Sequence, residues 1–228
     1  MQRVTQIVEH PRKPGRYVVH VDGREFATVS AETLAESKVA IGVVVDDAFA
    51  ARLQDATEDT AMYDRALNLL SFRARSSREL GRRLTEKGGS RERAERVIQR
   101  LRDVGLVNDA DFARQLTRSK LSAGASRRRV QQELFKRGVD RQVADEAVAQ
   151  VVEDDGLEDS VSIERVACKK WRTLASLDGP TRRRRLYAFL ARRGYNADDV
   201  SRVVRDLDRA AGVEADGGDA DDMVGGDA

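Results

Sequence analysis

Clustered arginine and lysine side chains are the residues of this sequence whose types and spacing could do chemistry, and that chemistry is the binding of anions. Arginine accounts for 34 of the 41 basic residues, and its guanidinium group can hold phosphate or carboxylate oxygens through two hydrogen bonds at once. A GC-rich genome would produce the same preference for arginine. The candidate binding residues are Arg82, Arg83, Arg127, Arg128, Arg129, Lys136, Lys169, Lys170, Arg182, Arg183, Arg184, Arg185 and Arg192.

Two of these clusters stand where local stability does not explain them. Arg127–Arg129 and Arg182–Arg185 occupy equivalent positions at the expected start of a helix, where cations oppose the helix dipole. We interpret them as part of a surface that faces DNA phosphates or an acidic protein groove. The alternative is a solvated face, which accounts for most runs of charge.

The near-neutral total charge hides a division along the chain. There are 41 basic and 39 acidic residues in all, but residues 63–211 alone carry 34 basic and 23 acidic side chains. Residues 1–62 carry 7 basic and 10 acidic side chains, and residues 212–228 carry 6 acidic and no basic ones. This asymmetry indicates that the middle segment carries the binding function.

Residues typical of enzymes and metal sites are scarce. The two histidines, His10 and His20, have no HExxH-type spacing, and neither GxxxxGK[ST] nor GxGxxG occurs. The single cysteine, Cys168, rules out a disulfide scaffold and is expected to pack on a helix. The acidic run 153–159 lacks calcium-loop spacing and is interpreted as a solvated link. We therefore expect no enzyme, no cofactor and no metal site.

The elements that must position the basic clusters begin with a small β-rich segment. Alternating residues predict strands at 4–9, 16–21 and 24–29, and Asp22-Gly23 is a strong signal for a two-residue hairpin turn. Ala31–Ala40, with Ser30 as its N-cap, and Asp46–Asp55 are predicted to be short helices.

An internal repeat, aligned on Gly88, Gly138 and Gly194, organises most of the remaining chain. A leucine lies four residues before each glycine, and further apolar residues lie eight before it and six, nine, ten and thirteen after it. These offsets predict two amphipathic helices separated by a glycine in left-handed conformation, and another amphipathic helix precedes each pair. The bases that precede the glycines, near the negative ends of these helices, are Lys87, Arg137 and Arg193.

Residues with capping side chains mark the helix starts of each repeat. Ser76 forms a capping box with Glu79, and Ser126 and Thr181 precede the equivalent helices in the next two repeats. The following helices begin after further capping residues, Asp140 among them. The regular placement of these signals supports the division into three units.

The predicted fold is mainly α, with three tandem three-helix repeats in an elongated curved array, preceded by a small N-terminal region that contains a β-hairpin. The β-rich region is placed at residues 1–60. The repeats are placed at 61–108, 109–157 and 158–211, and an acidic disordered tail follows at 212–228. This tail is rich in Gly and Asp and has too few large apolar groups to offset the entropy of ordering.

Aromatic residues are expected to serve mainly in the core. Trp171 lies on an apolar helix stripe, and Phe72 and Phe135 are expected to pack inside their repeats. Tyr187 and Tyr195 lie among arginines and could either pack or stack on nucleic-acid bases.

Taken together, these motifs resemble the RecX family of bacterial regulatory proteins over about residues 61–207. The resemblance rests on Arg75-Ser76-Ser77-Arg78-Glu79-Leu80, on Gly105-Leu106-Val107-Asn108-Asp109, and on the ending Leu190-Ala191-Arg192-Arg193-Gly194-Tyr195. The first repeat departs slightly, because Gly89 replaces the large residue often found after the glycine.

The resemblance implies a function that periodicity alone does not. RecX proteins bind the RecA recombinase, especially its filament on single-stranded DNA, and modulate it, mostly as inhibitors. This implies dampened strand exchange, ATP hydrolysis and RecA-assisted cleavage of the damage-response repressor, in DNA repair and the SOS response. RecX proteins are not themselves enzymes.

Two other functions compete with this interpretation. A direct DNA-binding helical protein could use the same arginine clusters, because small three-helix units also resemble helix-turn-helix modules. A passive helical scaffold is the third possibility. No run of about 18 apolar residues exists, and no signal-peptide core follows Met1-Gln2-Arg3. We expect a cytoplasmic monomer without membrane contact.

Overall fold

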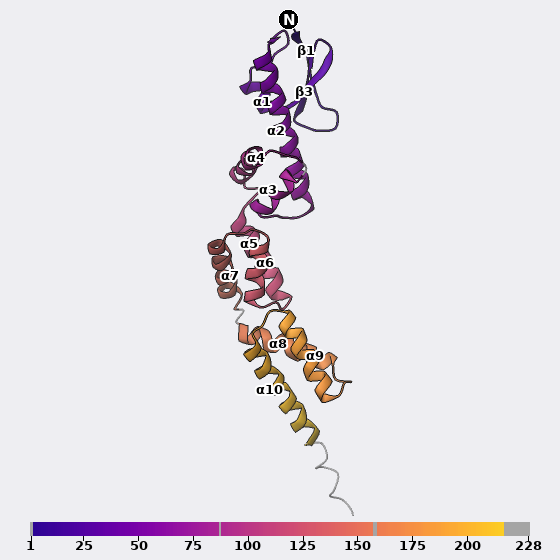
Figure 1. Cartoon of the computed structure of the whole chain (residues 1–228), viewed down its shortest axis with the longest axis vertical. Coiled ribbons are helices and arrows are strands. Elements are labelled where there is room, and N and C mark those ends of the chain that lie inside the picture. Colours follow the sequence, from indigo (N-terminus) through magenta and orange to yellow (C-terminus); the bar gives the residue numbers. More distant parts are fainter. Residues whose placement is uncertain (1, 87, 157–158, 217–228) are drawn as a thin grey trace, which may run out of the picture. The chain divides into compact units, whose positions relative to one another are not determined.

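The computed structural model of the chain describes residues 2–86, 88–156 and 159–216 (Figure 1). The chain divides into two compact units, Met1–Val107 and Asn108–Ala228, which are called unit 1 and unit 2 below. Unit 1 holds the N-terminal sheet and the first set of three helices, and unit 2 holds the second and third sets.

A four-stranded antiparallel sheet opens unit 1. Its strands are β1 (Gln2–Glu9), β2 (Arg16–Val21), β3 (Arg24–Ser30) and β4 (Val44–Val45), in the order β3-β2-β1-β4. Asp22 and Gly23 form the predicted hairpin turn, with φ values of +49° and +80° that a tight two-residue turn requires. The sequence predicted the first three strands; β4 has only two residues, too few for an alternating pattern.

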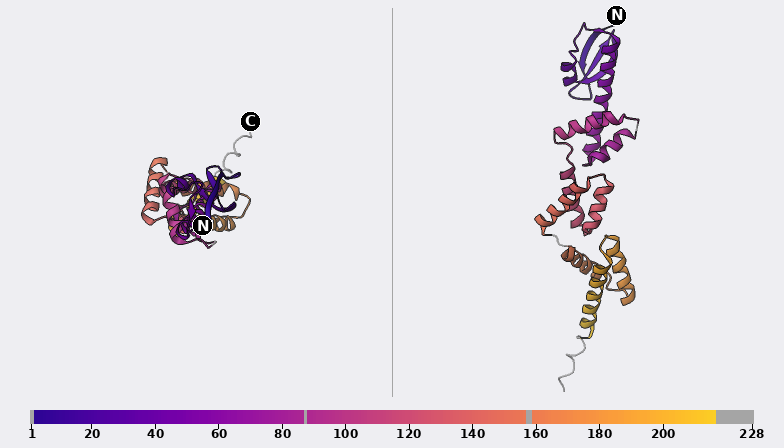
Figure 2. Two further views of the ribbon diagram at one scale, coloured as in Figure 1. Left: turned by 90° about the horizontal axis from the view of Figure 1, so that it is seen from above. Right: turned by 60° about the vertical axis from the view of Figure 1, so that its left-hand side comes forward.

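Two helices follow the sheet, and the second is longer than the sequence suggested. Helix α1 (Ala31–Glu36) begins after Ser30, whose hydroxyl accepts a hydrogen bond from the Thr33 amide as predicted. Helix α2 (Asp47–Phe72) lies against the sheet and contributes Phe49 and Leu53 to its core (Figures 1 and 2). The predicted helix at 46–55 is thus only the first part of α2. The helix continues past residue 60 because no Gly or Pro interrupts it.

Three domains of three helices each account for the remainder. Domain 1 consists of the last part of α2, α3 (Ser77–Thr85) and α4 (Arg91–Asp103). Domain 2 consists of α5 (Asp109–Ser122), α6 (Arg127–Lys136) and α7 (Arg141–Asp155). Domain 3 consists of α8 (Asp159–Thr173), α9 (Gly179–Arg192) and α10 (Ala197–Asp216).

The internal repeat is confirmed by what each domain buries. The leucines four residues before the aligned glycines, Leu84, Leu134 and Leu190, are fully buried, each in the separate core of its own domain. Burying such a side chain contributes about 2 kcal/mol. Equivalent positions therefore form the same core contacts in all three domains, which is why the pattern repeats in the sequence.

The helix ends follow the predicted chemistry. Ser76 and Ser126 cap α3 and α6 by accepting a hydrogen bond from the amide three residues later. Gly88, Gly138 and Gly194 all have φ between +80° and +90°, the left-handed conformation expected after a helix. Lys87 and Glu158, which figured in the sequence patterns, lie outside the described residues.

Domain 3 departs from the prediction at both ends. Asp178, not Thr181, is the N-cap of α9, and its carboxylate accepts a hydrogen bond from the Thr181 amide at 2.9 Å. Pro180 falls in the first turn, where a missing N–H costs nothing, so α9 starts a turn earlier than its counterparts. Helix α10 continues to Asp216, beyond the predicted boundary at 211. Residues 217–228 of the predicted tail lie outside the described residues.

Two aromatic predictions were wrong. Phe72 is 76% exposed and Phe135 is 66% exposed, because Phe72 ends α2 and Phe135 falls beside the apolar stripe of α6 rather than on it. Trp171 is buried in the core of domain 3, as predicted. Tyr195 is also buried there, whereas Tyr187 is 40% exposed.

Candidate functional site

Domains 2 and 3 meet at a junction inside unit 2 that involves two of the basic clusters. The Ser126 amide, at the N-cap of α6, donates a hydrogen bond of 3.0 Å to the carbonyl of Arg193 at the end of α9. The Arg193 guanidinium in turn donates to the Ala123 carbonyl, and the Tyr195 hydroxyl lies 3.4 Å from the Gly124 carbonyl. Backbone groups of both domains are therefore joined directly.

Glycine is required on both sides of this junction. A Cβ atom added to Gly124 would lie 2.6 Å from Val166 Cγ2, and one added to Gly194 would lie 2.7 Å from Arg129 Cβ. Both glycines also have φ values in the left-handed region, +81° and +90°. At either position a side chain would fit only if atoms of the neighbouring domain shifted.

The junction brings together arginines that lie far apart in the sequence. Arg128 and Arg129 are in the first turn of α6, and Arg192 is the last residue of α9, directly before Arg193. All three side chains are exposed, and within the described part of the chain none of them has a carboxylate at ion-pair distance. We call Arg128, Arg129 and Arg192 the junction arginines.

The backbone adds to the positive potential at the junction arginines. The N-terminus of a helix carries a partial positive charge, and the first turn of α6 contains no acidic residue that would offset it. The guanidinium groups of Arg128 and Arg129 thus lie where cations are locally unfavourable, and an anionic partner would relieve that repulsion. Arg192, at the C-terminal end of α9, adds a third positive charge. The arrangement is able to bind phosphate or carboxylate groups.

The other predicted binding residues divide into those that the fold uses and those left at the surface. Arg82 and Arg83 both pair with Glu86, at 3.7 and 3.1 Å, which offsets part of their charge. Arg182 lies 3.7 Å above the Trp171 ring and donates to the Trp171 carbonyl, so it supports the core of domain 3. The predicted equivalence of Arg127–Arg129 and Arg182–Arg185 at a helix start is wrong, because α6 begins at Arg127 whereas α9 begins at Gly179, before the second run.

The remaining positions are less uniform. Arg183 pairs with Asp208 at 2.7 Å, and Lys170 lies over the Phe189 ring. Arg127 is half-buried. The predicted binding residues outside the junction that remain exposed without an ion pair in the described residues are Lys136, Lys169, Arg184 and Arg185.

The comparisons with known proteins agree with the three-domain division. Residues 63–101, 108–148 and 158–204 match family models described as the first, second and third three-helix domains of RecX. The chain is also 37% identical over 149 residues to "Regulatory protein RecX" of Amycolatopsis mediterranei, covering 65% of this chain and 83% of that relative.

The chain belongs to the RecX family.

Other RecX proteins extend the similarity in sequence and in fold. "Regulatory protein RecX" of Mycolicibacterium smegmatis is 40% identical over 144 residues, covering 60% of this chain and 74% of that protein. The relative from Levilactobacillus brevis is 29% identical over 206 residues, or 90% of this chain and 76% of that one. A crystal structure of a regulatory protein RecX has a TM-score of 0.69 at 21% identity, covering 90% of this chain and all of that one. RecX from Lactobacillus salivarius has a TM-score of 0.54 at the same identity, covering 67% and 97%.

The RecX-like ending of the third repeat contains the junction residues that sequence reasoning missed. Arg193 and Tyr195 flank Gly194. From the sequence pattern, Arg193 was expected only to interact with the negative end of the helix dipole, and Tyr195 was expected either to pack or to stack on nucleic-acid bases. In the structure Arg193 also stacks 4.5 Å from the Phe189 ring and reaches the neighbouring domain. The signal was present in the motif, but nothing in it named the domain that these side chains contact.

Among the described residues, no three His, Cys, Asp or Glu side chains are grouped so as to hold a metal ion. None of the helices in that part of the chain combines the length and the apolar character needed to cross a membrane. Cys168 is half-buried and forms no disulfide bond within the described residues.

Proposed function

We propose that this protein binds the RecA recombinase, above all its filament on single-stranded DNA, and modulates it, mostly by inhibition. The observation that carries the proposal is the ordered match of residues 63–204 to all three RecX domains. The relatives are named regulatory proteins, which favours a binding role over catalysis. The processes affected would be strand exchange, ATP hydrolysis and RecA-assisted repressor cleavage, during DNA repair and the SOS response in the cytoplasm.

The junction arginines supply a physical basis for such binding. A nucleoprotein filament offers both acidic side chains and DNA phosphates, and guanidinium groups bind either with two hydrogen bonds. Arg128, Arg129 and Arg192 have no internal carboxylate to displace within the described residues, so an incoming anion does not first have to break an ion pair. Contacts of this kind accelerate association and weaken as salt rises.

The experiment that tests the proposal is DNA-dependent ATP hydrolysis by the cognate RecA in the presence of increasing amounts of this protein. We expect hydrolysis to fall with a saturable dependence on concentration. A co-sedimentation assay with RecA filaments reports binding separately from inhibition. Unchanged hydrolysis together with no co-sedimentation would reject the proposal.

Direct DNA binding is the second candidate, and the arginines in the first turn of α6 favour it. Fluorescence anisotropy of a labelled single-stranded oligonucleotide without RecA distinguishes the two functions. A DNA-binding protein would bind the naked oligonucleotide with an affinity that falls steeply with salt. A RecA modulator should prefer the filament at physiological salt, with only weak binding to the free strand.

A further inference from the structure

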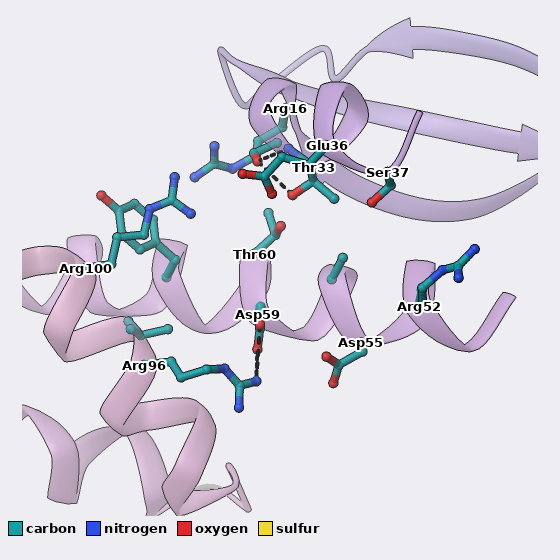
Figure 3. Close-up of a pocket in the computed structure, with 14 residues that line it drawn as sticks. Arg16, Thr33, Glu36, Ser37, Arg52, Asp55, Asp59, Thr60, Arg96 and Arg100 are labelled. Carbon is teal, nitrogen blue, oxygen red and sulfur yellow. Dashed lines mark hydrogen bonds and ion pairs between the residues drawn. The ribbon is translucent and has the colours of Figure 1, made fainter. Parts of the chain in front are cut away.

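A polar groove in unit 1 has no part in the surface described above. Its volume is about 350 Å³, and it follows α2 between α1 on one side and α4 on the other (Figure 3). The floor is formed by one face of α2, including Asp55, Thr60 and Tyr63. Volumes of roughly 300–1,000 Å³ are typical of small-molecule sites. The groove is therefore large enough for a small polar ligand.

Two guanidinium groups lie at one end of the groove. These are Arg16 from β2 and Arg100 from α4 (Figure 3). Their Cζ atoms are 6.0 and 4.9 Å from the centroid of the same Tyr63 ring. The nitrogens Nε and Nη2 of Arg16 both bind Asp64, a partly buried pair. Arg100 binds Glu32 through Nη2 only, and both of those side chains are about half exposed.

The pairing of Arg100 with Glu32 is the weak point at which an anion can enter. Exposed ion pairs contribute only about 0–1 kcal/mol, because water and salt screen them. A phosphate group offers more acceptor oxygens than one carboxylate and can take two parallel hydrogen bonds from a guanidinium. An anion at this end of the groove would therefore displace Glu32 from Arg100. The positive charge of Arg16 lies close by and would also attract it.

The other end of the groove has a different chemistry. Ser37, Arg52 and Asp55 lie there, away from Arg100 (Figure 3). The whole lining holds four arginines and three carboxylates, so its charge is nearly balanced. A polyanion such as a nucleic-acid strand would be repelled by the carboxylates. In a ligand with a single anionic group and several hydroxyl groups, the anionic group could bind an arginine of the lining, and the hydroxyl groups could form hydrogen bonds with its carboxylates and hydroxyls.

We propose that this groove binds a sugar phosphate, either free or as part of a nucleoside monophosphate. The phosphate group binds Arg100 beside Arg16, and the sugar hydroxyls donate hydrogen bonds to the hydroxyl of Ser37 and to Asp55, whose Oδ1 also accepts a hydrogen bond from Arg93. Carboxylates are the usual acceptors for ribose hydroxyls in nucleotide sites. The site is built from β2, α1, α2 and α4 together, which explains why no contiguous phosphate-binding motif marks it in the sequence. It does not depend on RecA binding, since its residues are separate from the junction arginines.

Isothermal titration calorimetry of the full chain tests the proposal, with ribose 5-phosphate, AMP, ribose and inorganic phosphate at matched ionic strength. We expect ribose 5-phosphate or AMP to bind at least about tenfold more tightly than inorganic phosphate, and ribose alone not to bind detectably. Tighter binding of AMP would identify a nucleotide, and equal affinities would identify the sugar phosphate itself. No binding of either compound at millimolar concentration would overturn the proposal, as would equal affinity for inorganic phosphate.

Variants locate the binding in the groove. Arg100→Gln should weaken ribose 5-phosphate or AMP by about 10- to 100-fold, the usual effect of losing a charge-assisted hydrogen bond. Arg100→Lys should weaken it less, because the charge remains. Arg91→Gln on the same helix is the matched control, since Arg91 is exposed and pairs only with Glu95 among the described residues. Affinity that survives Arg100→Gln, or that falls equally with Arg91→Gln, would place the ligand elsewhere and overturn the proposal. Circular dichroism confirms that each variant is folded.

Discussion

The Ser126 amide and the Arg193 carbonyl, 3.0 Å apart, join the start of one domain's second helix to the end of its counterpart in the next domain. Ser126 serves both domains at once, because its hydroxyl caps α6 by accepting from the Arg129 amide while its own amide is used by α9. A carbonyl at a helix end is otherwise left without an intrahelical partner. This hydrogen bond thus holds domains 2 and 3 together. It also satisfies backbone groups at the ends of α6 and α9 that would otherwise need another partner.

Gly194→Ala should weaken the hydrogen bond between Ser126 and Arg193 that joins domains 2 and 3. The new methyl group would lie 2.7 Å from Arg129 Cβ and 2.8 Å from Ser126 Oγ, and such overpacking costs about 1–3 kcal/mol. Amide hydrogen exchange at Ser126 measures the effect locally. We expect exchange there to accelerate by about 5- to 150-fold as the hydrogen bond to Arg193 opens more often.

Gly88→Ala is the matched control for this substitution. Gly88 occupies the equivalent position in domain 1 with a φ of +82°, but a Cβ there would meet nothing within 4 Å among the described residues. Both variants bear the cost of alanine in a left-handed conformation, about 1–2 kcal/mol. Only Gly194→Ala should change exchange at Ser126. Equal exchange at Ser126 in both variants would mean that the junction does not depend on close approach.

The repeat was predictable from the sequence because its signals are local. Leu134 and the stripe around it recur at helical spacing, and Ser126 precedes its helix by the one residue that capping requires. The pairing of Ser126 with Arg193 was not predictable, because periodicity shows which face of a helix is buried but not which helix ends meet. Arg16 and Arg100 meet at Tyr63 for the same reason: only the folded chain brings them together.

Candidate binding residues were harder to assign than the fold. A run of arginines has the same appearance in the sequence whether its members are exposed or stacked. Arg182 and Arg185 stand in one run, yet Arg182 covers the Trp171 ring and Arg185 is exposed. The pairing of Arg82 and Arg83 with Glu86 is local, at i,i+4 and i,i+3 spacing, and is visible in the sequence, whereas the absence of carboxylates around the junction arginines depends on the tertiary structure.

Neutralising the junction arginines should weaken the filament interaction. We expect Arg128→Gln combined with Arg129→Gln to reduce affinity for RecA filaments roughly tenfold and to flatten its salt dependence. Arg127 is left unchanged because it is half-buried. Filament co-sedimentation at several salt concentrations measures both effects, and circular dichroism checks helix content.

The corresponding pair in domain 1 provides the control for that double variant. Arg82→Gln combined with Arg83→Gln removes the same charge from side chains that Glu86 already pairs with. We expect a change of less than about twofold from this control. An equal loss from both double variants would show that net charge, rather than the junction, governs filament binding.

Glu79 should make the stability of unit 1 depend on pH in the acid range. Burial by itself would raise the pKa of this carboxyl group, but hydrogen bonds from Arg73 and Arg75 outweigh burial and lower the pKa below its ordinary value. Because the folded pKa is depressed, the stabilisation is complete above the unfolded value of about 4.3 and is lost as pH falls through the folded pKa.

Glu79→Gln should cost about 2 kcal/mol at pH 7, and the difference from wild type should shrink below about pH 4. Denaturant unfolding followed at pH 7 and at pH 3 measures both quantities. Glu95→Gln, at an exposed pair with Arg91, should change neither, and a Glu79→Gln deficit as large at pH 3 as at pH 7 would contradict the assignment.

Arg93 should be the most sensitive surface-charge position in unit 1. Its side chain is 14% exposed and extends from α4 to three carboxylates on α2, those of Asp55, Glu58 and Asp59. Burial alone would lower the pKa of its guanidinium, but the hydrogen bonds to Asp59 and Asp55 raise it further above its ordinary value.

Removing Arg93 leaves the carboxylates of Asp55 and Glu58 without an ion pair among the described residues and close to Asp59, which keeps its pair with Arg96, and like charges at such spacing repel. Arg93→Gln should therefore cost about 2 kcal/mol, more than a single exposed pair, because the loss combines a partly buried network with that new repulsion. Raising the salt concentration should recover part of the loss, since the three carboxylates are themselves largely exposed. Denaturant unfolding at low and high salt measures the effect, with Arg91→Gln on the same helix expected to cost less than about 0.5 kcal/mol. If the two variants were equally stable, the network would contribute nothing beyond ordinary surface pairs, and α2 and α4 would be held together by their apolar contacts alone.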